Sequence, residues 1–275
     1  MFPGIDGFHW DTGHVVFLGA FFCVLLLVAS TLLRAALRSL RDATPARVEK
    51  VRWHSDFADL ALDERCCRHE VTGEIASRTC RNEFDCRGCT EHPKFLAAHG
   101  AAQPSRTTAE VGGILLPLDR FYHRGHTWAR LESDGAYTIG LDELAEAAIG
   151  QPDSVDLPAA GSQVFVNGTA WTVRKGEDTV RILSPVDGEV LESGVDDGEC
   201  RLRVRPAAGF RATHLLAGNE AVRWFRREFE RLQAALGDPS VGSALADGGE
   251  LVADLEKAYP KTDWQAVRGA MFLEP

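Results

Sequence analysis

Residues 157–192 read LPAAGSQVFVNGTAWTVRKGEDTVRILSPVDGEVLE, and this stretch decides the fold. Short runs of β-branched and aromatic residues are separated by Gly161, Gly168, Gly176 and Gly188. Short strand-forming runs between turn residues are typical of a β-sandwich or a β-barrel. The stretch therefore predicts a domain built mainly from short strands.

The residues before this stretch continue the pattern. Residues 126–141 read HTWARLESDGAYTIGL, in which alternating residues flank the turn dipeptide Asp134-Gly135, so they predict a β-hairpin. A short helix is expected next, with Asp142 as its N-terminal cap and Gly150 at its end. The fold class that follows is mainly β with short helices.

Together these motifs resemble the H protein of the glycine cleavage system, a family that carries a lipoyl group on a lysine at the tip of a β-hairpin. The resemblance implies a lipoyl/H-protein-like β-sandwich hybrid over residues 116–236, which is under half of the chain. The matching features are Tyr122, His126 and Trp128, the Asp134-Gly135 turn, Ile139-Gly140-Leu141, the short helix before Gly150, Leu157-Pro158 followed by Gly161, and Ser184-Pro185-Val186-Asp187-Gly188-Glu189-Val190.

The chain departs from this family at the lipoyl position. In the family the modified lysine lies sixteen residues after the glycine that matches Gly161 and seven residues before the residue that matches Ser184. Both counts end at residue 177, which is a glutamate here. Lipoylation forms an amide with a lysine amine, and the carboxylate of Glu177 cannot take part in it. Lys175 is the one lysine in the region, two residues early, so we expect loss of the carrier function, with a lipoylated Lys175 in a shifted hairpin as the alternative.

An uncharged apolar segment near the N-terminus predicts a membrane span. Residues 15–33 read VVFLGAFFCVLLLVASTLL. As a helix they are about 28 Å long, close to the roughly 30 Å of a bilayer's hydrocarbon core. Basic residues follow the segment between Arg34 and Lys50 and none precedes it, which argues against a cleaved signal peptide. The positive-inside rule then predicts an N-terminus outside the inner (cell) membrane and cytoplasmic domains after it.

Five of the seven cysteines fall within residues 66–89, CCRHEVTGEIASRTCRNEFDCRGC. Cys86 and Cys89 form a C-x2-C pair, a spacing at which two thiolates can bind one metal ion from a tight turn. The pattern predicts a metal site, and it leaves open whether Cys66 or Cys67 is the fourth ligand. The candidate ligands are Cys66, Cys67, Cys80, Cys86 and Cys89, with His69 and His92 as possible substitutes.

Several chemistries fit these thiols. A structural zinc site is the first expectation, and an iron–sulfur cluster uses the same ligand set. Disulfides are disfavoured because the cytoplasm keeps thiols reduced, and a redox or metal sensor is a further alternative. We expect Cys23, within the apolar segment, and the isolated Cys200 to have structural roles.

Charge and motif content exclude other classes of function. The chain has 275 residues and a net charge of -10, from 30 basic and 40 acidic residues. Without an excess of Lys and Arg to neutralise phosphates, general nucleic-acid binding is not expected. No nucleophile–base pair or carboxylate dyad stands at a recognisable spacing, so we do not expect an enzyme.

The C-terminal part of the chain is predicted to be helical. Residues 215–236 place Val222, Phe225, Phe229 and Leu232 three and four positions apart, as on one face of a helix. Shorter helical pieces after them would cap the domain or dock on a partner, and we identify Trp264 and Phe272 as candidate aromatic anchors.

These patterns combine into one organisation and one functional hypothesis. The hypothesis is a non-catalytic, membrane-anchored accessory subunit of a larger membrane complex, for example a redox complex. The alternatives are a lipoyl carrier that uses Lys175 and an iron–sulfur electron-transfer subunit. The predicted parts are an extracytoplasmic N-terminus at 1–14, a transmembrane helix at 15–33, a juxtamembrane segment at 34–60, a cysteine-rich metal-binding module at 61–95, a linker at 96–115, the H-protein-like domain at 116–236 and a helical C-terminal extension at 237–275.

Overall fold

The computed structural model divides the chain into two compact units, residues 1–47 and 48–275. The predicted extracytoplasmic segment lies mostly outside the described residues, and the juxtamembrane segment and the C-terminal extension lie partly outside them. The structure describes residues 11–42, 50–196, 199–237, 246–247, 250–251 and 254–274.

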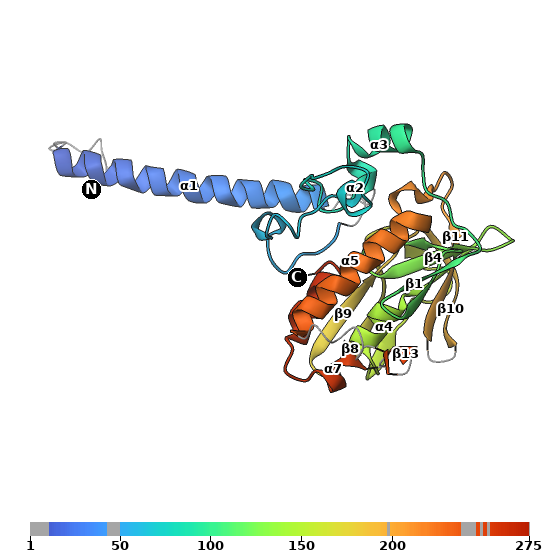
Figure 1. Ribbon diagram of the computed structural model, residues 1–275. Coiled ribbons are helices and arrows are strands. Elements are labelled where there is room, and N and C mark those ends of the chain that lie inside the picture. Colours follow the sequence, from blue (N-terminus) through green and yellow to red (C-terminus); the bar gives the residue numbers. More distant parts are fainter. Residues whose placement is uncertain are drawn as a thin grey trace. The chain divides into compact units, whose positions relative to one another are not determined.

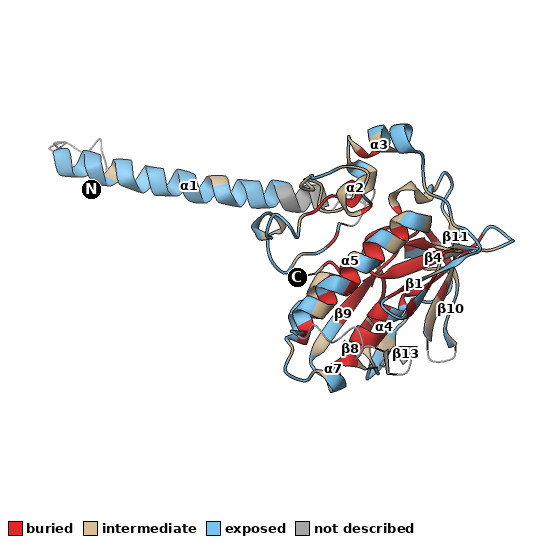
Figure 2. Ribbon diagram, in the orientation of Figure 1, coloured by how far each residue is buried: buried red, intermediate tan, exposed pale blue. Residues whose placement is uncertain are grey.

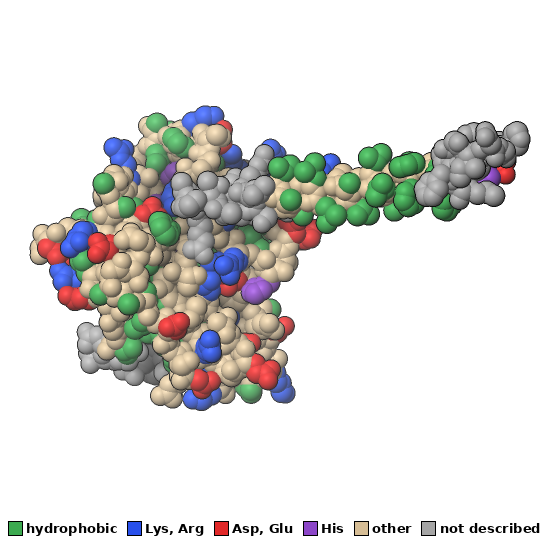
Figure 3. All heavy atoms as spheres, turned by 180° about the vertical axis from the view of Figure 1, so that it is seen from behind, with side chains coloured by type: hydrophobic (Ala, Val, Ile, Leu, Met, Phe, Trp, Pro, Cys, Tyr) green, Lys and Arg blue, Asp and Glu red, His purple; other side chains and the backbone are tan. Residues whose placement is uncertain are grey.

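The first unit is the helix α1 (Thr12–Asp42). Within its segment Thr12–Leu37, a stretch of 18 residues has a mean hydropathy of 2.7, and none of that stretch is buried within the protein. Hydrophobic side chains line this helix along the face that Figure 3 shows. The hydroxyls of Ser30 and Thr31 donate to carbonyl oxygens three residues earlier, so these polar groups are satisfied within the helix. The helix is therefore long and apolar enough to cross a membrane, as the sequence predicted.

The second unit is built on two antiparallel sheets (Figure 1). The larger sheet has the strand order β3-β4-β5-β11-β10-β7 and the smaller one the order β6-β8-β9. Two further hairpins pair β1 with β2 and β12 with β13. The strands are β1 (Thr108–Val111), β2 (Ile114–Pro117), β3 (Phe121–Tyr122), β4 (Thr127–Leu131), β5 (Tyr137–Leu141), β6 (Ser154–Asp156), β7 (Gln163–Val164), β8 (Thr169–Lys175), β9 (Asp178–Leu183), β10 (Gly188–Asp196), β11 (Glu199–Pro206), β12 (Ala246–Asp247) and β13 (Glu250–Leu251).

Short helices complete the unit. The predicted helix after the β4–β5 hairpin is α4, where the Asp142 carboxylate accepts from the backbone N–H of Ala145 and the helix ends at Gly150. The α-helices are α2 (Arg68–Val71), α3 (His92–His99), α4 (Glu143–Ile149), α5 (Gly218–Leu236), α7 (Leu255–Ala258) and α8 (Trp264–Met271), and the 3₁₀ helices are η1 (Phe57–Asp59), η2 (Cys86–Gly88) and η3 (Ala212–His214).

The helix α5 covers one side of the main core (Figure 2). Its apolar face buries Trp224, Phe225, Phe229 and Leu232 against the strands, and each such side chain contributes about 1.5–3 kcal/mol when removed from water. Gly112, in the β1–β2 turn, lies so close to the Phe229 ring that a Cβ there would be 2.3 Å from it. This close approach requires glycine at the turn.

The C-terminal residues belong to the same core. Trp264 is 5% exposed and Phe272 is 1% exposed, and both pack in the main cluster of buried residues. The indole N–H of Trp264 donates to the Tyr259 carbonyl at 2.9 Å. Of the two roles considered for these aromatic residues, capping the domain is the one that the structure shows, because buried rings are not available as anchors for a partner.

The segment expected to be a linker, residues 96–115, also contains ordered structure. Helix α3 ends within it and the β1–β2 hairpin begins within it. Val111, Ile114 and Leu116 of this hairpin are buried in the core. Taken as a whole, the unit is mainly β with short helices, as the sequence predicted.

Candidate functional site

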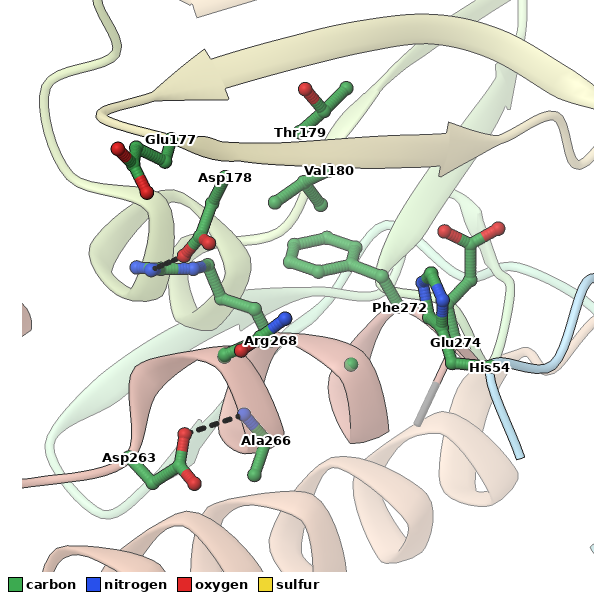
Figure 4. Close-up of a pocket in the computed structure, with 12 residues that line it drawn as sticks. His54, Glu177, Asp178, Thr179, Val180, Asp263, Ala266, Arg268, Phe272 and Glu274 are labelled. Atoms are coloured by element: carbon green, nitrogen blue, oxygen red, sulfur yellow. Dashed lines mark hydrogen bonds and ion pairs between the residues drawn. The ribbon is translucent and has the colours of Figure 1, made fainter.

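The β8–β9 hairpin ends in a two-residue turn. Lys175 pairs with Asp178 across the strands, so Gly176 and Glu177 form the connecting loop. Gly176 has φ +61°, a conformation that a two-residue hairpin loop commonly requires and that favours glycine. Its N–H donates to Asp153 Oδ2 at 2.7 Å. Glu177 is exposed at the end of the hairpin, as Figure 4 shows, so residue 177 stands at the apex.

Lys175, the alternative lipoyl site, is held by the rest of the protein. Its ammonium donates to the Ile149 carbonyl at 2.7 Å and lies 3.2 Å from Asp254 Oδ1 and 3.0 Å from Glu256 Oε2. The side chain is 17% exposed. The amine is therefore engaged in two ion pairs and a hydrogen bond rather than displayed to solvent.

Asp254 is the residue that joins the C-terminal part to this lysine. It also caps α7 by accepting from the backbone N–H of Lys257 at 3.3 Å. Burial raises the pKa of Asp254, but hydrogen bonds from Lys257 and Lys175 more than offset it, so the pKa lies below the ordinary aspartate value. Gly150 permits this approach, since a Cβ there would lie 2.5 Å from the Asp254 carboxyl carbon.

A cavity of about 460 Å³ adjoins the hairpin (Figure 4). Arg268 of α8 is buried and makes ion pairs with Asp178 at 2.5 Å and Glu256 at 2.9 Å. Glu274 is paired with Arg181 of β9. The charged groups around the cavity thus bind one another and fix the C-terminal residues against β9. The lining residues are His54, Glu177, Asp178, Thr179, Val180, Asp263, Gln265, Ala266, Arg268, Gly269, Phe272 and Glu274.

The cysteine-rich segment begins with two chain segments that pair like short strands. The N–H of Cys67 donates to the Arg78 carbonyl at 2.8 Å, and the N–H of Cys80 donates to the Arg65 carbonyl at 2.6 Å. Cys66 forms an isolated antiparallel bridge with Thr79 between them. This pairing brings cysteines that are distant in sequence onto neighbouring segments.

The other two cysteines of the cluster lie in a 3₁₀ turn. Cys86 begins η2, and the N–H of Cys89 donates back to its carbonyl at 3.3 Å. Asp85 caps the turn by accepting from the backbone N–H of Arg87 at 3.0 Å, and a second bond joins the Arg87 side chain to the same carboxylate. The C-x2-C spacing thus corresponds to one capped turn of the chain.

Four of the five clustered cysteines line one cavity of about 20 Å³. They are Cys67, Cys80, Cys86 and Cys89. All seven cysteines are free thiols. Among the residues that the structure describes, no group of three or more His, Cys, Asp or Glu side chains is arranged to hold a metal ion. The four sulfurs share a cavity, with positions that do not converge on one point.

Cys66 differs from its neighbour. It does not belong to the cavity lining, and its Sγ lies 3.7 Å from the Cys67 carbonyl oxygen. Burial, and then a hydrogen bond with Glu70, raise the pKa of Cys66 to about 11, and burial raises the pKa of Cys86 to about 12. The structure therefore places Cys67, and not Cys66, with the other three thiols.

The two histidines considered as substitutes bind protein groups with both ring nitrogens. His69 Nε2 lies 2.8 Å from His92 Nδ1, and the other nitrogen of His69 contacts Glu74. His92 Nε2 lies 3.0 Å from the Thr213 carbonyl oxygen. Burial, more than the nearby Arg68, lowers the pKa of each ring to about 4. The two rings therefore form a buried chain of hydrogen bonds that joins the cysteine-rich segment to η3.

Comparison with known proteins identifies the family. The family model for "Glycine cleavage H-protein" matches residues 120–196, which include the β8–β9 hairpin. The "Glycine cleavage system H protein" of Escherichia coli O7:K1 (strain IAI39) is 31% identical over 96 residues, which cover 34% of this chain and 74% of that protein. The chain belongs to the glycine cleavage H-protein family.

Other relatives match a shorter part of the H-protein fold. The H protein of Aromatoleum aromaticum is 35% identical over 81 residues, 30% of this chain and 63% of that protein. The H protein of Saccharophagus degradans is 41% identical over 70 residues, 26% of this chain and 54% of that protein. The chain thus spans little more than half the length of these two relatives. The crystal structure of the Mycobacterium marinum H protein aligns at a TM-score of 0.33 with 22% identity, covering 39% of this chain and 97% of that one.

The features that sequence reasoning missed are long-range. The pattern identified Lys175 as a possible lipoyl site, but it did not identify Asp254 and Glu256, about eighty residues later, as its partners. The same limit applies to Arg124, whose guanidinium reaches Cys66 from the H-protein-like domain. No local signal of periodicity or spacing marks such pairs.

Proposed function

We propose that this chain is a non-catalytic, membrane-anchored accessory protein whose H-protein-like domain binds other proteins and does not carry lipoate. The observation that carries the proposal is the chemistry of the hairpin: Glu177 stands at the apex, and the amine of Lys175 is bound by Asp254 and Glu256. The scaffold of a carrier is retained, and the position that would bear the cofactor holds a carboxylate.

Lipoylation requires an amine that can attack an activated acyl group. The Glu177 carboxylate cannot form that amide. The Lys175 amine would have to leave two carboxylates and one carbonyl before it could react. Both features favour an unmodified hairpin.

The anchoring part of the proposal rests on α1 and on the charges that follow it. The apolar segment Thr12–Leu37 can span a bilayer. Arg34, near the C-terminal end of this segment, and the further basic residues up to Lys50 place positive charge on that side. We therefore propose an inner-membrane location with the N-terminus outside and residues after the helix in the cytoplasm.

The proposed partners are the membrane and protein subunits of a larger complex. The relatives are named as parts of a glycine cleavage system, which supports a domain surface suited to contacts with other proteins. A domain without a displayed cofactor contributes such a surface and a fixed position at the membrane. On this proposal, the chain assembles with its partners and performs no chemical step of its own.

The decisive experiment is lipoylation of the full chain in detergent micelles, with a lipoyl ligase, lipoate and ATP, followed by intact mass measurement. We expect no adduct on the natural sequence and one lipoyl group on Glu177→Lys, because that variant displays an amine at the hairpin apex. Lys175→Arg in the Glu177→Lys background is the matched control and should retain the adduct. A lipoyl group on the natural chain that disappears in Lys175→Arg would restore the carrier role.

Membrane topology is tested separately with reporter fusions at the C-terminus of the full chain. A green fluorescent protein fusion should be fluorescent, and an alkaline phosphatase fusion should be inactive, because both reporters would lie in the cytoplasm. The opposite pair of results would place the domains outside and contradict the proposed orientation.

A further inference from the structure

The cavity shared by four thiols has the size of a single ion. Its volume is about 20 Å³. A cavity needs roughly 10–15 Å³ by such a measure to hold one water molecule, so this one accommodates one atom of similar size. A four-iron cluster with its sulfides is several times larger than one water molecule. The cavity size therefore favours a mononuclear metal over an iron–sulfur cluster.

The backbone around the cavity is fixed from both sides. Cys67 and Cys80 are held by the paired segments, and Cys86 and Cys89 are held by the capped 3₁₀ turn. Each cysteine has one side-chain torsion with three staggered positions, so its sulfur can turn without movement of the backbone. Convergence of the four sulfurs at the Zn–S distance of about 2.3 Å thus requires side-chain rotation within a defined frame.

Positive charge is already present at the cavity wall. Arg124 and Arg68 both line it. Arg124 also interacts electrostatically with the Glu228 carboxylate. Its guanidinium donates to the Cys66 carbonyl at 3.2 Å and lies 3.8 Å from the centre of the Phe84 ring. Negative charge beside a partly buried guanidinium lowers the cost of its burial.

A four-thiolate zinc site would add negative charge beside these arginines. One Zn²⁺ and four thiolates carry a net charge of −2, and the lining of the cavity holds three arginines (Arg68, Arg78 and Arg124) and two carboxylates (Asp85 and Glu91). Arg68 is also paired with Glu220 at 2.6 Å, which fixes its position next to the cavity. The charge of the wall thus complements the site that the thiols would form.

From these observations we infer that Cys67, Cys80, Cys86 and Cys89 bind one zinc ion as a structural four-thiolate site and that Cys66 is not a ligand. Zinc binding breaks four S–H bonds and forms four Zn–S bonds, and the four protons pass to solvent without any change of oxidation state. The coordination sphere is then complete with protein sulfur, as in closed structural sites, and leaves no position for a substrate.

This inference goes beyond the proposed accessory function and is independent of it. A zinc site would be compatible with a lipoylated or an unlipoylated hairpin, because the hairpin and the cavity share no residue. Failure of one experiment therefore says nothing about the other.

The test compares adjacent cysteines in the full chain, purified in detergent without chelators and without oxygen. Zinc, iron and acid-labile sulfide are measured per chain for the natural sequence, Cys66→Ala, Cys67→Ala and Cys80→Ala, with Cys200→Ala as a second control. We expect about one zinc ion in the natural chain, in Cys66→Ala and in Cys200→Ala, and at least a tenfold loss in Cys67→Ala and Cys80→Ala. Cobalt(II) substituted into the natural chain should give the intense thiolate charge-transfer absorption of a tetrahedral sulfur site.

Several outcomes would overturn the inference. Iron with sulfide in place of zinc would identify an iron–sulfur cluster on these ligands. No metal in the natural chain, together with an absence of cobalt binding, would remove the site altogether, whatever the folding of the variants. Equal loss of zinc in Cys66→Ala and Cys67→Ala, with both variants retaining the circular dichroism spectrum of the natural chain, would reject the assignment of Cys67 over Cys66.

Discussion

The two ends of the compact unit are held by different kinds of contact. At the hairpin end, carboxylates bind Lys175 and Arg268 through ion pairs between side chains. At the cysteine end, one ion pair joins Arg68 to Glu220, and side chains also reach across to main-chain carbonyls: Arg68 and His92 to Thr213, and Arg223 to Thr72. The hairpin end therefore depends on pairs of side chains, whereas the cysteine end combines one ion pair with contacts whose acceptor is backbone that no substitution removes.

The two kinds of contact differ in how far they depend on particular side chains. The backbone-based contacts position the cysteine-rich segment regardless of which side chains occupy the carbonyl-bearing residues. The ion pairs at the hairpin end neutralise the lysine nearest the apex. Main-chain acceptors therefore help to hold the cysteine end, whereas ion pairs at the hairpin end keep the Lys175 amine away from solvent.

The largest expected effect is at the cysteine end. Arg68 is 3% exposed, and Arg68→Met would leave the partly buried Glu220 carboxylate unpaired. Because breaking a buried pair strands a charge, we expect the free energy of unfolding to fall by about 3–5 kcal/mol. Urea denaturation followed by tryptophan fluorescence measures it. Arg106→Met, at an exposed position, is the control. A loss of unfolding free energy as small as that of the control would show that the packing of α2 on α5 does not depend on the Arg68–Glu220 pair.

A smaller effect is expected from acid, through a buried histidine near the cysteine end. Burial lowers the pKa of His123 to about 4, despite its hydrogen bond with Asn167. In the unfolded chain this pKa is about 6.5, so unfolding takes up a proton and the stability present above pH 6.5 is lost as the pH falls toward 4.

His123→Gln removes this titration. We expect the loss of stability between pH 7 and pH 4 to shrink by on the order of 2–3 kcal/mol, measured by denaturation at a series of pH values. The same substitution at the exposed His99 should leave the pH dependence as it is. An unchanged slope in His123→Gln would mean that the buried ring does not set the acid sensitivity of the fold.

The smallest effect is expected at the hairpin end. Lys175→Met removes ion pairs whose members are partly exposed, so the unfolding free energy should fall by about 1 kcal/mol. Added salt screens such pairs, and the stability of the natural chain should therefore depend more on salt than that of the variant. Hydrogen exchange at the amides of α7 should increase in the variant. Lys261→Met is the exposed control, and identical salt dependence in all three proteins would show that the hairpin end is not held by charge.

Local patterns predicted what local forces determine. The turn at Asp134-Gly135, the cap at Asp142 and the apolar face of α5 follow from short-range rules, and the structure contains each of them. The position of residue 177 at a hairpin tip followed from counting residues against a known family.

Contacts between distant residues could not be predicted in this way. The choice between Cys66 and Cys67 depends on how the segment around Thr79 pairs with them, because adjacent residues of an extended segment point in opposite directions. The burial of Trp264 and Phe272 depends on space left by strands far away in the sequence. Periodicity indicates which face of a helix or strand is apolar, but it does not show which other part of the chain will cover that face.

The C-terminal residues that pack on β9 extend the folded domain beyond the region that the family model matches. Leu255 and Phe272 are fully covered, and α7 and α8 pack against α4, which lies within the family-matched region. A gene fragment cut to the length of the family match would leave α4 with an uncovered apolar face and Lys175 without its carboxylates. Such a fragment should therefore be less stable and should expose Lys175, so the C-terminal residues are part of the same folding unit as the hairpin.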